Sequence, residues 1–202
     1  WRAIMKLIFR NRFRHTTSGF TLIEMLVVVV IITVLAAIIA ASWTAAVNRQ
    51  RINTVRDQAN RIIQQARADA KRSGIARVVV FGGRDGTTLE AAIVAPSLDA
   101  NTGRTGGFVN DFTTINNWQS LGSQEVADRN VDFSVSPGTE RQIIFESNGT
   151  VSRASIDEAI SDEVIFAFNV RPKGTSTNAN RCVIVGTLLG ATRTADGTDC
   201  PT

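Results

Sequence analysis

Apolar residues dominate one uninterrupted stretch near the N-terminus. No charged side chain occurs from residue 25 to residue 48, a run of 24 residues. A helix needs about 20 predominantly apolar residues to cross a bilayer. The run therefore predicts one membrane-spanning segment. The segment before it, residues 1–19, is basic and ends in the small pair Ser18-Gly19.

The hydrophobic pattern changes beyond residue 48. Apolar residues now recur at steps of three and four, which places them on one face of a helix. They are Ile52, Val55, Ala59, Ile62, Ile63, Ala66 and Ala70. No proline or glycine occurs between Phe20 and Ser73, and Gly74 is a residue typical of a helix C-terminus. We expect one long helix, with a membrane-spanning part at 20–43 and an amphipathic part at 44–74.

Short β-branched runs and turn residues alternate after Gly74. The predicted strands are residues 76–81, 89–95, 132–136, 142–146, 150–156, 163–170 and 181–189. Asn148-Gly149 is a strong hairpin signal, and residues 96–125 are rich in loop-forming residues. The sequence thus predicts an α+β fold, in which the long helix packs on a mainly antiparallel β-sheet head formed by residues 75–202.

The net charge of +4 mostly describes the first 19 residues. That segment holds five of the 22 Lys and Arg residues, so its removal leaves 17 against 18 Asp and Glu. The remaining charge is divided, with +6 on residues 49–77 and −6 on residues 78–202. A basic helix therefore leads into an acidic head.

The basic N-terminal segment also indicates an orientation. Loops rich in Lys and Arg stay on the cytoplasmic side, so the head is expected outside the inner membrane. In a secretory signal the cleavage site follows the apolar core. Here the small pair precedes it, and a cut after Gly19 would leave the apolar helix attached to the mature protein.

The string Gly19-Phe-Thr-Leu-Ile-Glu24 resembles the N-terminus of type IV pilins and type II secretion pseudopilins. The resemblance implies that residues 1–19 are a prepilin leader. A prepilin peptidase would cut after Gly19 and methylate the new amine of Phe20. It also implies that Glu24 pairs with the N-terminal amine of a neighbouring pilin or pseudopilin subunit and sets the axial register.

A physical argument supports a special role for Glu24. An uncompensated charge in the bilayer costs roughly 2.5–3.5 kcal/mol on insertion scales, so this carboxylate needs a partner. The amine created at Phe20 would supply one. The alternative is a glutamate that reaches the headgroups of an ordinary membrane-tethered domain, which would not be cut at Gly19.

Two further segments narrow the resemblance. Residues 53–72 and the hairpin at 143–151 are similar to GspH/FimT-type minor subunits. This implies a minor subunit near the tip of a type IV pilus or a type II secretion pseudopilus, where it helps to start assembly. Some relatives bind DNA through a basic C-terminal loop, so a DNA-uptake role is the alternative. Residues 189–200 hold one arginine, Arg193, and two aspartates. This weakens the DNA-binding alternative, because contacts with phosphates need several cations.

The basic face of the helix is a second candidate for contacts. Its cations are Arg49, Arg51, Arg56 and Arg61. They could meet DNA, anionic lipid headgroups or the acidic heads of neighbouring subunits. The division of charge between helix and head favours the subunit contacts.

The two cysteines, Cys182 and Cys200, are separated by 17 residues. A disulfide across such a loop would contribute about 3 kcal/mol in the chain-entropy model. It would form only in an oxidising compartment, which the predicted export of the head provides. Two free thiols are the alternative.

Catalysis and cofactors find no support in the sequence. The single histidine, His15, lies in the leader, so the mature chain has no histidine to activate a serine or cysteine. Asp196 and Asp199 have oxygen ligands at a spacing that could suit calcium. A polar turn explains them as well, and we expect neither a metal nor another cofactor.

Overall fold

The computed structural model describes residues 19–98, 105–122, 131–136, 141–152, 155 and 164–201. The rest of the predicted leader, residues 1–18, lies outside the described residues. The chain divides into two compact units, Trp1–Thr44 and Ala45–Thr202. Each is described by itself below.

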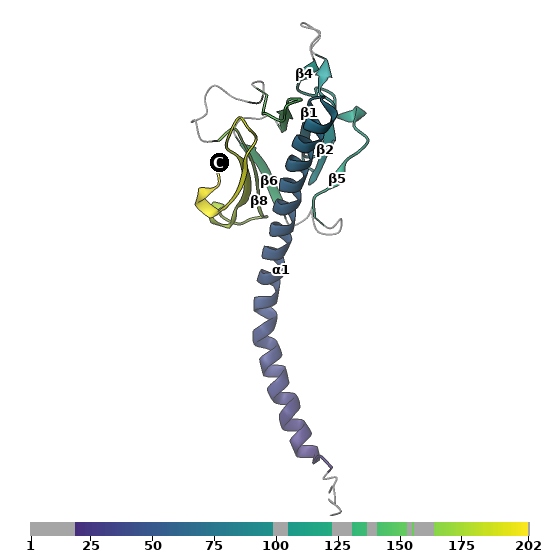
Figure 1. Cartoon of the computed structure of the whole chain (residues 1–202). Coiled ribbons are helices and arrows are strands. Elements are labelled where there is room, and N and C mark those ends of the chain that lie inside the picture. Colours follow the sequence, from purple (N-terminus) through teal and green to yellow (C-terminus); the bar gives the residue numbers. More distant parts are fainter. Residues whose placement is uncertain are drawn as a thin grey trace, which may run out of the picture. The chain divides into compact units, whose positions relative to one another are not determined.

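One helix, α1, spans Leu22–Ser73 (Figure 1). It ends where the sequence predicts, because Gly74 adopts a left-handed conformation with φ +65° and its amide donates to Ala70 O at 3.0 Å. The predicted long helix is therefore confirmed, with a start two residues later than expected. Its apolar part, Leu22–Ile39, is long and apolar enough to cross a membrane, and none of it is buried.

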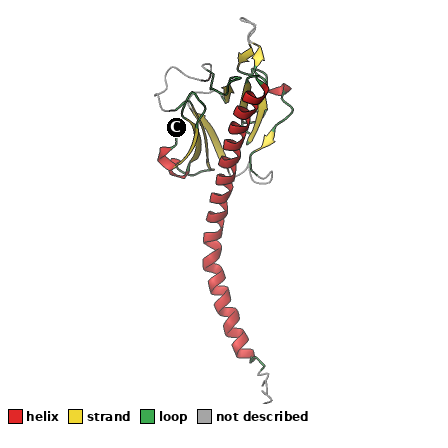
Figure 2. Ribbon diagram, in the orientation of Figure 1, coloured by secondary structure: helices red, strands yellow, loops and turns green. Residues whose placement is uncertain are grey.

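The second unit contains the amphipathic part of α1, and the predicted stripe is its buried face. All seven apolar residues are at most 6% exposed, namely Ile52, Val55, Ala59, Ile62, Ile63, Ala66 and Ala70. They form one hydrophobic cluster with residues from two β-sheets. Figure 2 shows this part of the helix beside the strands of the head.

The first sheet has the strand order β5-β2-β1-β7. Its strands are β1 (Arg77–Phe81), β2 (Glu90–Val94), β5 (Gln119–Ser120) and β7 (Gln142–Phe145). All neighbours are antiparallel, and Val79 lies opposite both Ile93 and Ile143. The central strand β1 is buried because α1 covers one face and residues such as Ile115 and Trp118 cover the other.

The second sheet has the order β10-β9-β8-β6, again antiparallel throughout. Its strands are β6 (Val131–Ser136), β8 (Phe166–Pro172), β9 (Arg181–Val185) and β10 (Thr192–Asp196). Phe81 of the first sheet stacks on Phe168 of the second, with ring centroids 4.7 Å apart. The two sheets and the helix thus share one core.

The sequence-based description of the head needs several corrections. The strands form two four-stranded sheets and a small ribbon of β3 (Ser97–Leu98) and β4 (Thr105–Gly107), not one sheet. The predicted loop at 96–125 also holds β5 and a 3-10 turn, Phe112–Thr114. These elements are too short to leave a periodic signal.

Three strand predictions were wrong in detail. Within the described part of 150–156, only Val151 forms a bridge, to Phe145. The strand expected at 181–189 ends at Val185, where a turn through Gly190 begins, and that turn leads into β10. We missed β10 because it is polar and mostly exposed. The strand expected at 163–170 is shifted and runs over Phe166–Pro172.

Candidate processing and assembly site

The start of α1 is built by a capping arrangement. The Glu24 amide donates to Thr21 Oγ1 at 3.3 Å and to Thr21 O at 3.1 Å. The Thr21 hydroxyl thus caps the N-terminus of α1 and satisfies an amide that the helix cannot pair. Thr21 was not among the predicted site residues, although a threonine three residues before a glutamate is a readable helix-start signal. Thr21 therefore fixes where the helix begins and where Glu24 lies on it.

Glu24 lies in the first turn of α1 and is exposed. A helix N-terminus carries partial positive charge, which favours a carboxylate at this position. Within the described residues, no salt bridge involves Glu24. Phe20 is 75% exposed, and a side chain added at Gly19 would meet no atom within 4 Å. The predicted cleavage position and the carboxylate are thus accessible to other molecules.

A disulfide joins Cys182 and Cys200, as predicted. Cys182 lies in β9 and Cys200 follows the 3-10 turn Gly197–Asp199, with Cα atoms 5.8 Å apart. Both cysteines are buried. A hydrogen bond from Asn169 Nδ2 to Pro201 O, at 2.8 Å, adds a second attachment. The C-terminal segment is therefore fixed to the second sheet.

Arg56 is engaged within its own chain. Its Nη1 lies 3.3 Å from Asp196 Oδ1, and its Nη2 lies 3.0 Å from Asp57 Oδ1. Arg181 Nε also reaches Asp196 Oδ1, at 3.2 Å. This network links the helix to β9 and β10. Its members are partly exposed, so each pair contributes no more than about 1 kcal/mol.

The other predicted arginines differ in their surroundings. Arg49 and Arg61 are exposed on α1, Arg51 is half-buried there, and Arg193 is exposed on β10. Their assignment to DNA, lipid or subunit contacts stays a prediction. Among the described residues, no group of three or more His, Cys, Asp or Glu side chains could hold a metal ion. The carboxylate of Asp196 instead forms ion pairs with the guanidinium groups of Arg56 and Arg181.

Hydrogen bonds keep two exposed aspartates of the head ionised at lower pH than usual. Hydrogen bonds from the backbone and hydroxyl of Thr87, and from the Thr88 amide, hold the pKa of Asp85 far below its usual range. The hydroxyl and amide of Thr113 lower the pKa of Asp111 in the same way. Both carboxylates therefore stay ionised into acidic conditions.

Residues 14–40 match the family model of the prokaryotic N-terminal methylation motif. This chain carries an N-terminal methylation motif. The match contains the whole string from Gly19 to Glu24 and the whole apolar part of α1, Leu22–Ile39. It confirms, over these residues, the resemblance to the type IV pilin and pseudopilin superfamily.

Comparisons with whole proteins give weaker likenesses. No curated protein matches the chain in sequence. Among solved structures, the minor pseudopilin EpsH of the Vibrio cholerae Type 2 Secretion System is 17% identical, over 73% of this chain and 98% of its own, with a TM-score of 0.44. The Pseudomonas aeruginosa type IV minor pilin FimU is 13% identical over 76% and 95%, with a TM-score of 0.48. Escherichia coli GspH is 12% identical over 75% and 92%, with a TM-score of 0.41.

Proposed function

We propose that this chain is a minor pilin or pseudopilin, a structural subunit that is processed by a prepilin peptidase and built into a filament. The observation that carries the proposal is the position of the methylation motif. It spans 14–40 and includes the exposed apolar helix segment Leu22–Ile39. In a filament subunit such a helix has two successive roles. It first anchors the subunit in the membrane, and it then packs against other subunits in the filament.

Cleavage after Gly19 creates a cationic amine at Phe20, and methylation keeps that charge. The amine lies at the positive end of α1, which disfavours it electrostatically. Pairing with a carboxylate from another subunit compensates this unfavourable electrostatic energy. It also compensates the hydration that the amine and the carboxylate lose between apolar helices. Because an unpaired charge between apolar helices is costly, Glu24 and the Phe20 amine of a neighbour fix one axial register.

The remaining features support an extracytoplasmic head. The leader stays in the cytoplasm, the apolar part of α1 crosses the inner membrane once, and residues 45–202 lie outside. The disulfide between Cys182 and Cys200 is compatible with this placement, because disulfides persist in oxidising compartments. The filament is a type IV pilus or a type II secretion pseudopilus, and the subunit acts near its tip, where assembly starts.

Intact-mass and N-terminal analysis of the protein from its native membranes tests this proposal. The expected chain begins at N-methylated Phe20. A Gly19→Val variant is the matched control, since nothing in the described structure opposes a side chain there, and it should remain uncut. A wild-type chain that still carries residues 10–19 would refute the processing and leave a membrane-tethered β domain.

A further inference from the structure

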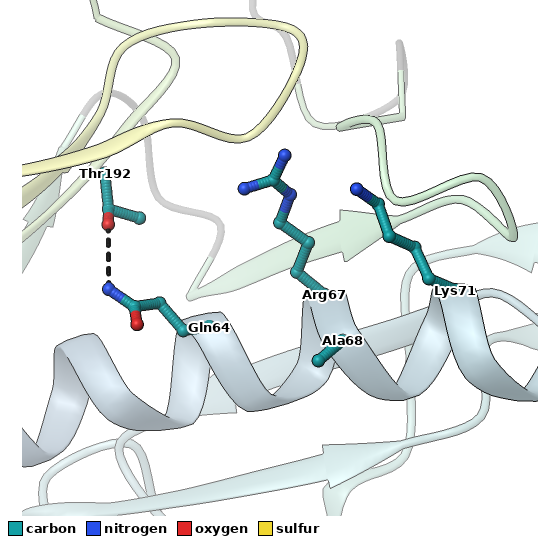
Figure 3. A pocket seen from close by; sticks show the side chains of 5 residues that line it. All are labelled: Gln64, Arg67, Ala68, Lys71 and Thr192. Atoms are coloured by element: carbon teal, nitrogen blue, oxygen red, sulfur yellow. Dashed lines mark hydrogen bonds between the residues drawn. The ribbon is translucent and has the colours of Figure 1, made fainter.

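Two cations of the amphipathic helix lie side by side at a surface pocket of the head. The pocket has a volume of about 300 Å³ and is lined by Gln64, Arg67, Ala68, Lys71 and Thr192. Arg67 and Lys71 are four residues apart, so they occupy the same face of α1. Figure 3 shows both side chains extending from the helix toward the loops of the head.

The stem of each cation is held by a glycine turn. A Cβ at Gly149 would collide with the stem of Lys71, and a Cβ at Gly190 would lie 3.2 Å from Arg67 Cδ. Arg67 Nε also donates to Gly149 O at 3.2 Å. Both glycines have positive φ, of +78° and +73°. These turns leave room for the two stems and hold them in place.

The charges of these two side chains are not neutralised within the described residues. The described salt bridges there use Arg56, Arg72, Arg171 and Arg181, and none uses Arg67 or Lys71. Two neighbouring cations repel each other, and an anion from outside would offset that repulsion. Because the stems are already held, binding such an anion costs less side-chain entropy.

Two exposed leucines belong to the turn whose Gly190 lies against Arg67. Leu188 is 54% exposed and Leu189 is 67% exposed, in the turn between β9 and β10 that also contains Gly190. Leu188 O accepts a hydrogen bond from Val151 N at 2.8 Å, which ties this turn to the hairpin of Gly149. Exposed apolar side chains next to unpaired cations are typical of protein interaction surfaces.

We propose that Arg67, Lys71, Leu188 and Leu189, here named the cationic turn surface, dock a polypeptide segment of a neighbouring filament subunit. That segment presents a carboxylate to the two cations and an apolar side chain to the leucines. The inference rests on the proposed function, since it needs a filament. Nucleic acid fits less well, because two cations make few phosphate contacts and the leucines make none.

The test is site-specific photo-crosslinking in cells that assemble the filament. The full chain carries Leu189→p-benzoylphenylalanine, and crosslinked peptides from the sheared filament fraction are mapped by mass spectrometry. The expected product contains a segment of another subunit with Asp or Glu beside an apolar residue. Adding Lys71→Glu should lower its yield about tenfold, as expected for the loss of roughly 1.4 kcal/mol.

Arg72→Glu is the matched control. It makes the same change of charge one residue further along α1, at a side chain that is 86% exposed and pairs with Asp69. The crosslink yield should stay within twofold of the parent. A Lys substitution at the mapped carboxylate of the partner should restore the yield in the Lys71→Glu background.

Several results would overturn the inference. They are a crosslink to lipid or nucleic acid, a partner segment without a carboxylate, no crosslink, or a yield that Lys71→Glu leaves unchanged. N-terminal analysis of the same samples separates the two proposals. An uncut chain, or one missing from the filament fraction, refutes the proposed function and the inference with it. A cut chain in the filament without a charge-dependent crosslink refutes the inference alone.

Discussion

The two parts of α1 contrast in where their apolar side chains find contacts. Ile32 in the first part is 59% exposed, whereas Ile63 in the second is fully buried. Apolar residues cover all sides of the first part, but only one stripe of the second. A stripe can be covered by the two sheets of its own head, whereas a helix that is apolar all round needs surroundings supplied by lipid or other subunits.

The two parts of α1 also differ in their charged residues. The first part has no charged residue beyond Glu24, and the second carries its cations outside the buried apolar stripe. One continuous helix thus combines a segment suited to a membrane with a segment suited to a soluble core.

The largest effect is expected at Glu24. Glu24→Val removes the only charge of the apolar part, so membrane insertion should persist. Recovery in the sheared filament fraction should fall to background, because the amine of the neighbouring subunit loses its counter-charge. Immunoblots of membrane and filament fractions measure both quantities.

Thr21→Ala is the control for Glu24→Val. It removes the capping hydroxyl, at a cost of about 1 kcal/mol in helix stability, but keeps the carboxylate. It should still enter the filament. Equal recovery of Glu24→Val and wild type would mean that the carboxylate only helps to start the helix.

The second prediction compares the same substitution in the two parts. Ile63→Ala leaves a cavity in the shared core and should destabilise the head by about 2–5 kcal/mol. Ile32→Ala should change head stability by less than about 0.5 kcal/mol, because that side chain has no buried contacts to lose. Chemical denaturation of the purified full chain in detergent, followed by tryptophan fluorescence, measures both. Similar losses would remove the distinction between the two parts.

The third prediction concerns the C-terminal attachment of the head. Reduction of the Cys182–Cys200 disulfide frees the segment after β10 and should cost about 3 kcal/mol in the chain-entropy model. The melting temperature of the head should fall in reductant, and a Cys182→Ser/Cys200→Ser double variant should show the same lower value without it. An unchanged melting curve in reductant would show that this bridge adds no stability.

The smallest expected effect is at Asp85. Hydrogen bonds lower its pKa in the folded protein below the unfolded value of about 4. The ionised carboxylate therefore stabilises the folded state above pH 4, and this contribution is lost as the pH falls through the folded pKa. Asp85→Asn should lower the melting temperature at pH 7, and the difference from wild type should shrink toward acidic pH.

Asp199→Asn is the control, because it removes the same charge from a carboxylate that accepts no hydrogen bond within the described residues. It should leave the melting temperature at pH 7 unchanged. A difference between Asp85→Asn and wild type that is constant between pH 3 and pH 7 would show that ionisation of Asp85 is not the cause.

The sequence predicted some parts of this fold much better than others. The helix was predictable because its two hydrophobic patterns extend over many turns and Gly74 marks its end. Strands β1 and β7 were predictable because they are buried runs next to clear turns. Strand β10 was missed because it is polar and mostly exposed, and the ribbon of β3 and β4 was missed because strands of two and three residues leave no alternating apolar pattern.

The candidate sites divide in the same way. Gly19, Phe20 and Glu24 lie within six consecutive residues, so the motif was visible in the sequence. The cationic turn surface was not, since Lys71 lies 78 residues from Gly149 and 118 from Leu189 along the chain. The intrachain ion pairing of Arg56 with Asp196 was hidden for the same reason.

Features that depend on neighbouring residues were readable from the sequence alone: the methylation motif, the apolar and amphipathic parts of one helix, and the division of charge between helix and head. Only the folded structure shows how the strands divide between two sheets, which arginines form ion pairs within the chain, and which cations lie against a turn with exposed leucines. The physical reason is that helical periodicity and short motifs are local, whereas strand pairing and charge compensation depend on residues that only folding brings together.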